Sequence, residues 1–147
     1  MTAEAIAGVP LQDLELAVLS ACETGLGEVG CGEGVFGLQR AFHLAGTRNV
    51  VASLWQVDDE ATAALMGLFY HKMWDERKPP IIALREAQLT LYRHPDRIGV
   101  LARARALDFD KAEPLPAEAA SGDKERRPGG RAAIKLWAAF LLSGTGR

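Results

Sequence analysis

The sequence predicts an α/β protein with a mostly parallel sheet. Three short apolar runs have the length and residue types of strands, and the segments between them repeat apolar residues at helical spacing. Strands that alternate with helices are typical of a parallel sheet, because a helix carries the chain back between successive strands. The apolar runs contain few polar residues, which is typical of strands that are covered on both faces.

The amino-terminal part is predicted to contain a short helix, a strand and a glycine-rich loop. Residues 2–13 favour a short helix before Pro10. Leu14–Ala21 is apolar along most of its length and is predicted to form the first strand. Residues 22–34 hold five glycines, at positions 25, 27, 30, 32 and 34, and are predicted to form a loop.

A helix, a second strand and another helix are predicted after this loop. Gly34–Ala45 places its apolar residues at helical spacing, and the glycine that follows suits a carboxyl-terminal cap. Asn49–Trp55 is the second apolar strand. Either Asp58 or Asp59 is expected to cap the next helix, which continues through Trp74.

The carboxyl-terminal part is predicted to hold one more helix, an insertion and a last strand. Pro80 suits the first turn of a helix, and the apolar spacing continues to Leu91. The stretch at about 107–131 is dominated by Ala, Glu, Lys, Arg, Pro and Gly, which favours a solvated, mobile insertion. Leu136–Leu142 is apolar throughout and is predicted to be the final strand, ending at Ser143.

Three strands make a thin sheet for a fold of this class. The first strand, Leu14–Ala21, would be a poor edge strand, because an apolar edge invites pairing with other chains. The sequence therefore indicates only the C-terminal half of a larger domain. We expect the isolated chain to associate through this strand.

Composition narrows the classes of function. A chain of 147 residues allows one domain or a part of one, and its formal charge of −2 favours neither nucleic acid nor an anionic membrane as partner. No apolar run reaches transmembrane length, and the first residues do not resemble a signal peptide. Two cysteines nine residues apart give no disulfide framework. These features predict a cytoplasmic protein with reduced thiols.

Cys22 is the candidate nucleophile. It follows the first predicted strand and precedes a glycine-rich turn, the position at which open α/β sheets place their reactive groups. The alternative is a buried structural cysteine, since free cysteines are among the most buried residues. His43, His71 and His94 do not follow a predicted strand, so the sequence assigns none of them as the base. Cysteine and histidine show no paired ligand spacing, so no metal is expected.

A glycine motif at Gly32–Gly37 opens the next helix and matches G-x-G-x-x-G, with Asp58 about twenty residues further on. This pattern favours a nucleotide cofactor. However, the loop that begins at Cys22 separates the motif from its strand, which prevents the tight turn that brings a pyrophosphate to the helix. The alternative is that these glycines shape a loop or allow close packing, and no cofactor is expected.

The segment that ends the second strand suggests a peptide-binding surface. Ser53 and Leu54 could pair with an extended peptide, and Trp55 could form a wall of a side-chain pocket. Asp58 could favour basic side chains in that pocket, although helix capping explains an acidic residue at this position equally well.

These residues together resemble the CHAT domain, a family of caspase- and separase-like cysteine peptidases. The resemblance covers most of the chain outside residues 95–131. It rests on Leu19-Ser20-Ala21-Cys22-Glu23-Thr24-Gly25, Gly32-Glu33-Gly34, Leu38-Gln39-Arg40-Ala41-Phe42, Ala45-Gly46, Val50-Val51-Ala52-Ser53-Leu54-Trp55, Val57-Asp58-Asp59, Leu65-Met66, Phe69-Tyr70, Ala83-Leu84-Arg85-Glu86-Ala87-Gln88 and Trp137-Ala138-Ala139-Phe140.

The resemblance implies a caspase-like three-layer sandwich and a Cys–His dyad peptidase that acts on a protein or peptide. Cys22 matches the nucleophile, and Ser53–Trp55 matches the strand that pairs with substrate in caspase-like enzymes. The family's histidine precedes the cysteine on the neighbouring strand, whereas this chain has no histidine before Cys22. The histidine is therefore expected from the upstream half of the domain or from a partner chain. The alternatives are a non-catalytic protein-interaction module and a nucleotide-binding domain.

Overall fold

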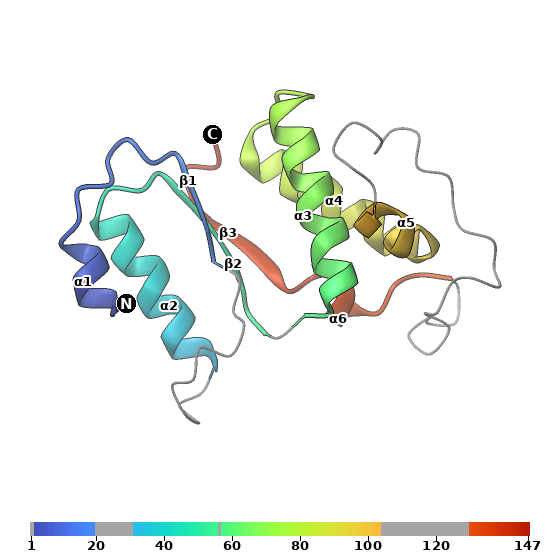
Figure 1. Cartoon of the computed structure of the whole chain (residues 1–147), viewed down its shortest axis with the longest axis horizontal. Coiled ribbons are helices and arrows are strands. Elements are labelled where there is room, and N and C mark those ends of the chain that lie inside the picture. The colour runs from blue at the N-terminus through green and yellow to red at the C-terminus, as the bar shows by residue number, and fades with distance from the viewer. Residues whose placement is uncertain (1, 20–30, 56, 104–129) are drawn as a thin grey trace. The chain divides into compact units, whose positions relative to one another are not determined.

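The computed structural model describes residues 2–19, 31–55, 57–103 and 130–147. The chain divides into two compact units. The first unit comprises residues 1–56 and 139–147, and the second comprises residues 57–138. Figure 1 shows the elements of both units in chain order.

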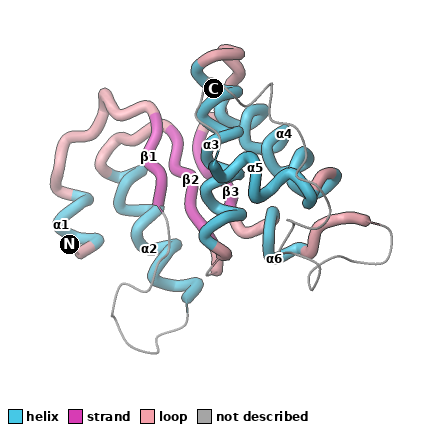
Figure 2. The backbone as a smooth tube through the Cα atoms, turned by 45° about the vertical axis from the view of Figure 1, so that its right-hand side comes forward, coloured by secondary structure: helices cyan, strands magenta, loops and turns pink. Residues whose placement is uncertain are grey.

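The first unit is built on a three-stranded sheet in the order β1-β2-β3 (Figure 2). Its strands are β1 (Leu16–Leu19), β2 (Asn49–Ser53) and β3 (Phe140–Gly144). β1 is parallel to β2, and β3 is antiparallel to β2. All five residues of β2 are buried, as expected for the central strand of an apolar sheet. The α/β class is therefore confirmed. The prediction of a mostly parallel sheet is wrong for the described strands, which form one parallel and one antiparallel pair, because β3 runs beside β2 in the opposite direction.

Two helices complete the first unit. Helix α1 (Ala3–Ala7) begins at Thr2, whose side chain accepts a hydrogen bond from the Ala5 N–H. Helix α2 (Cys31–Leu44) contacts α1 and lies against β2. It begins three residues earlier than predicted. It ends before Gly46, whose φ of +107° is readily adopted only without a side chain.

A buried asparagine joins the three strands at one end of the sheet. Asn49 is fully buried, and its Nδ2 group donates to the carbonyl oxygens of Glu15, at 3.2 Å, and Arg147, at 3.1 Å. Its Oδ1 atom accepts a hydrogen bond from the Gly146 N–H at 2.8 Å. Because each of these polar groups has a partner, Asn49 begins a buried strand without an unsatisfied amide.

The second unit is helical. Its long helices are α3 (Asp59–Trp74) and α4 (Pro80–Arg93), and they are followed by η1 (Pro95–Arg97), α5 (Ile98–Arg103) and α6 (Ile134–Trp137). Helix α3 contacts both α4 and α5. The largest fully buried side chains of this unit are Leu65, Phe69, Leu91 and Leu101. Among the described residues, no helix is long and apolar enough to cross a membrane.

The predicted helices in this unit are confirmed at Asp59–Trp74 and Pro80–Arg93. The predicted last strand is wrong in its position. Residues 134–137 form α6, and the strand runs over Phe140–Gly144 instead of Leu136–Leu142. An unbroken apolar run does not distinguish a short helix from a strand, which explains the error. Helix α5 was not predicted, and most of the predicted insertion at 107–131 lies outside the described residues.

Candidate functional site

The parallel strands β1 and β2 both end on one side of the sheet. This side, the C-terminal edge, differs from the lateral edge that runs along β1. β1 and β2 run in the same direction, and Leu19 lies level with Ala52. The chain therefore leaves both strands at the same edge, where α/β folds bind ligands. Cys22 comes three residues after Leu19 and lies outside the described residues. Its role as nucleophile stays a prediction, and the described candidates at this edge are those that follow β2.

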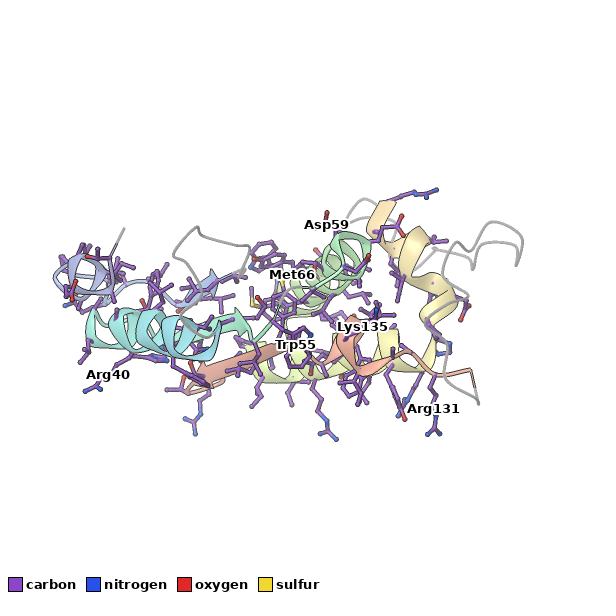
Figure 3. The ribbon with its side chains drawn as sticks, turned by 90° about the horizontal axis from the view of Figure 1, so that it is seen from below. Arg40, Trp55, Asp59, Met66, Arg131 and Lys135 are labelled. Carbon is purple, nitrogen blue, oxygen red and sulfur yellow. The ribbon has the colours of Figure 1, made fainter. Side chains whose placement is uncertain are left out.

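The end of β2 holds the residues predicted to contact a peptide. Ser53 is almost fully buried, whereas Leu54 and Trp55 are half-buried. The Leu54 N–H donates to the Ala139 carbonyl oxygen at 2.8 Å, so this segment still pairs with the chain that leads into β3. Figure 3 labels Trp55 just after β2. Its indole Nε1 is buried and has no hydrogen-bond partner among the described residues.

Asp58 caps helix α3. Its Oδ1 atom accepts a hydrogen bond from the Ala61 N–H at 3.0 Å, which satisfies one of the free amides of the first turn. The capping interpretation of the sequence is therefore confirmed for Asp58. Asp59 and Glu60 lie in the first turn, where the helix dipole favours negative charge. Asp58 belongs to the second unit and Trp55 to the first. A shared pocket of these two residues stays a prediction.

His43 has two hydrogen bonds within the first unit. Its Nδ1 atom lies 3.1 Å from the Thr47 carbonyl oxygen, and its Nε2 atom lies 2.9 Å from Ser143 Oγ. A carbonyl oxygen only accepts, so Nδ1 donates to Thr47, and the Ser143 hydroxyl also lies 3.5 Å from the Val50 carbonyl oxygen. Sequence reasoning missed this pair because its members are 100 positions apart. The pair links α2 to β3.

His71 and His94 lie on the helices of the second unit. The His71 Nδ1 atom is 2.8 Å from Asp75 Oδ2, one turn further along α3. His94 is exposed and ends α4, where its backbone N–H donates to the Thr90 carbonyl oxygen. The structure describes all three histidines of the chain, and none of them follows a strand. This confirms the sequence-based expectation about where they lie.

The glycine motif lies inside a helix. Helix α2 begins at Cys31, so Gly34 and Gly37 are within it, and residues 20–30 separate it from β1. A Cβ atom at Gly34 or Gly37 would meet nothing within 4 Å, so close packing in the described surroundings does not require glycine at either position. This arrangement lacks the short strand-to-helix turn of a dinucleotide site.

Among the described side chains, no group of three or more His, Cys, Asp or Glu residues could hold a metal ion. Among the described residues, the ionisable groups with clearly shifted pKa values are Tyr70, Glu76, Lys78 and Glu86, and all four are in the second unit. Burial raises the pKa of Tyr70. The other three belong to an ion-pair network that includes α4 and the connection between α3 and α4, so their shifts have a structural cause.

Comparison with models of protein families gives a match over almost the whole chain. A family model described as the CHAT domain matches residues 1–145. No curated protein and no solved structure matches the chain significantly.

Proposed function

The chain belongs to the CHAT domain family, which is related to the caspase-like peptidases, and on this premise we propose that it is the C-terminal part of a cysteine endopeptidase domain. Cys22 is the proposed nucleophile. The base is a histidine supplied by the upstream half of the domain or by a partner chain. A protein or a peptide is the proposed substrate, and the cytoplasm is the proposed location.

The parallel pairing of β1 and β2 is the observation that carries this proposal. Leu19 and Ala52 are level, and Cys22 and Trp55 follow them by three positions each in the sequence. Both residues therefore come shortly after strands that end at the same edge of the sheet. A nucleophile and a substrate-binding segment must both meet one peptide, and strands that end at one edge supply that arrangement. The family match over residues 1–145 gives this edge a peptidase interpretation.

The proposed reaction follows from the chemistry of a thiol and an imidazole. The histidine takes the proton from Cys22 Sγ, which attacks the carbonyl carbon of the scissile peptide bond. Backbone N–H groups stabilise the negative charge that forms on the carbonyl oxygen. The histidine then gives its proton to the leaving amine, and a thioester remains. Water, activated by the same histidine, hydrolyses the thioester and restores the thiol.

Residues at the end of β2 and directly after it are proposed to bind the substrate. Ser53 and Leu54 would position its backbone, while Trp55 would form one wall of its side-chain pocket. The half-buried indole ring supports this role because its accessible part offers apolar surface to a substrate side chain. Asp58 would attract basic side chains. Its cap to Ala61 uses one oxygen atom, and the residue is exposed.

The open edge of β1 supports an external source of the histidine. β1 pairs only with β2 in the described sheet, and its four residues Leu16–Leu19 are all apolar. Asn49 lies level with Leu16 and donates its N–H to the Glu15 carbonyl oxygen. In a parallel ladder, this hydrogen bond means that the backbone N–H and C=O groups of Leu16 and Val18 point away from β2 and toward the open edge of β1. A further strand, with the histidine after its end, would pair there.

A labelling experiment tests this function. The chain, with and without its upstream region, is incubated with a thiol-directed peptidyl probe and analysed by mass spectrometry. We expect labelling that needs the upstream region, disappears in Cys22→Ala and persists in the matched control Cys31→Ala. Labelling that survives Cys22→Ala would remove Cys22 as the nucleophile.

A non-catalytic interaction module is the second candidate. His43 and His71 are both engaged in hydrogen bonds within their own units, which favours this alternative for the chain without a partner. Under this alternative the same sheet edge would bind a peptide without cleaving it. Peptide binding by the chain with its upstream region, together with no labelling of Cys22, would select this second function.

A further inference from the structure

The last described segment of the chain, residues 130–147, belongs to both units. Its first part, through Ala138, lies in the second unit, and its second part, from Ala139, lies in the first unit. The connection that precedes it, residues 104–129, lies outside the described residues, and its sequence is rich in charged residues, proline and glycine. The contacts of residues 130–147 therefore decide how this segment is held to the rest of the molecule.

In the second unit, the segment is held against the end of α4. The Ala132 N–H donates to the Tyr92 carbonyl oxygen at 3.0 Å, and Ala132 is buried. The rings of Tyr92 and Trp137 have their centroids 5.1 Å apart, and Arg131 Nη1 donates to the Tyr92 hydroxyl at 3.0 Å. One backbone hydrogen bond and two side-chain contacts therefore meet at Tyr92.

In the first unit, the segment is held by β3 and by the residues that follow it. Each of the five residues of β3 lies level with a residue of β2, and Phe140 is buried. Ser143 Oγ lies 2.9 Å from His43 Nε2 on α2. Beyond the strand, Asn49 accepts a hydrogen bond from the Gly146 N–H and donates to the Arg147 carbonyl oxygen. These contacts form a second, separate anchor.

From these two anchors we infer that residues 130–147 are a docking segment, which binds the rest of the molecule by its own contacts and stays bound when the connection at 104–129 is cut. A covalent connection adds to such an interaction only an effective concentration, about millimolar at most for a linker. The docking segment combines the main-chain pairing of an added strand with buried apolar side chains, which is how extended peptides bind to sheets.

Cutting the folded full chain within this connection tests the inference. A recognition site for a specific protease, flanked by glycines, is inserted after Pro116, and an affinity tag is added at the amino terminus. After cutting is complete on a denaturing gel, we expect the docking segment to stay with the tagged piece during size-exclusion chromatography at about 1 µM protein. Release of a fluorescently labelled docking segment on dilution then gives its dissociation constant.

Substitutions at the second-unit anchor make the test specific. Trp137→Ala should raise the dissociation constant about tenfold or more, because it removes the ring that packs on Tyr92. The matched control is Ile134→Ala, which removes an exposed apolar side chain from the same helix, α6, and should change little. Arg131→Ala is a milder change that removes the hydrogen bond to the Tyr92 hydroxyl. Circular dichroism before cutting checks that each variant folds.

Each outcome supports or overturns the inference. Retention of the docking segment that is weakened by Trp137→Ala and not by Ile134→Ala supports it. Release of the segment from the cut parent chain under native conditions would overturn it. Equal dissociation constants for the cut parent chain, Trp137→Ala and Arg131→Ala would overturn the anchor at Tyr92. The result is independent of Cys22, so the peptidase proposal stands or fails separately.

Discussion

Single residues at the end of the sheet show how the first unit is held together. Asn49 is a polar side chain at the start of an apolar strand, and its hydrogen bonds to Glu15, Gly146 and Arg147 connect all three strands. Gly144 completes this arrangement, because its positive φ turns the chain toward those partners. Asn49 and Gly144 both hold the backbone in place at this end of the sheet, so substitutions there should change the stability of the fold.

Gly144→Ala should destabilise the protein, whereas Gly37→Ala should not. Alanine at position 144 must adopt a φ of +124° with its Cβ atom 2.2 Å from the Arg48 carbonyl oxygen. We expect a loss of about 2 kcal/mol or more in the free energy of unfolding. Gly37 lies within α2 and has open space around a Cβ atom, so alanine there should stabilise by about 1 kcal/mol.

Urea unfolding followed by circular dichroism measures both changes. Equal midpoints for Gly144→Ala and the parent chain would contradict the described backbone at the end of β3.

At the scale of elements, an ion-pair network holds the end of α3 against the start of α4. Lys78 Nζ lies 2.5 Å from both Glu76 Oε2 and Glu86 Oε2, and Lys72 pairs with the same two carboxylates at 3.2 and 3.1 Å. The hydrogen bond from Lys78 is the main reason that the pKa values of Glu76 and Glu86 lie below their usual range. The same contacts raise the pKa of Lys78.

The network should make thermal stability depend on pH. A carboxylate whose folded pKa is lowered stabilises the fold above its unfolded pKa of about 4.3, and this contribution is lost as the pH falls through the folded value. Lys78→Gln should therefore lower the melting temperature at pH 7, and the difference from the parent chain should shrink below about pH 4. Thermal unfolding monitored at a series of pH values checks this.

Arg85→Gln is the matched control, since it removes one positive charge from an exposed position on α4. It should change the melting temperature much less at pH 7. A difference between Lys78→Gln and the parent chain that stays constant from pH 7 to pH 3 would exclude the carboxylates as its cause.

An element could be predicted where the sequence carries a local signal for its start. Helix α3 has an aspartate cap and α4 a proline in its first turn, and these signals predicted both helices. β3 carries no comparable start signal, because its apolar residues continue directly from α6. Its antiparallel direction depends on pairing with β2, more than eighty residues earlier in the chain.

At the scale of the whole molecule, the sheet has an apolar strand at its edge. β1 is paired on one side only in the described sheet, and it has no charged residue over Leu16–Leu19. Such an edge favours pairing with another strand, from the upstream half of the domain or from a second copy. The sequence predicts that an apolar strand at an edge would associate with other chains. In the described sheet, β1 does lie at the edge.

We expect the chain without its upstream region to self-associate as its concentration rises. Val18→Pro should reduce this association, because the N–H of Val18 faces the open edge and its loss leaves the ladder to β2 intact. Ala17→Pro removes an N–H that faces β2 and should disrupt the fold instead. Sedimentation velocity over a range of concentrations, with circular dichroism for folding, distinguishes these results.

A chain that remains a monomer at all concentrations would contradict the half-domain interpretation. Association that is unchanged in a folded Val18→Pro variant would assign the contact to another surface.

The α/β class, the family and the main helices could be predicted from the sequence alone, because they depend on local spacing and on motifs, whereas the roles of Cys22 and Trp55 stay predictions. The order of the strands, the direction of β3, the His43–Ser143 pair and the hydrogen bonds of Asn49 to Glu15, Gly146 and Arg147 became known only from the tertiary structure. These features join residues that are far apart in the chain, and their partners are set by strand register and packing, which no local pattern encodes.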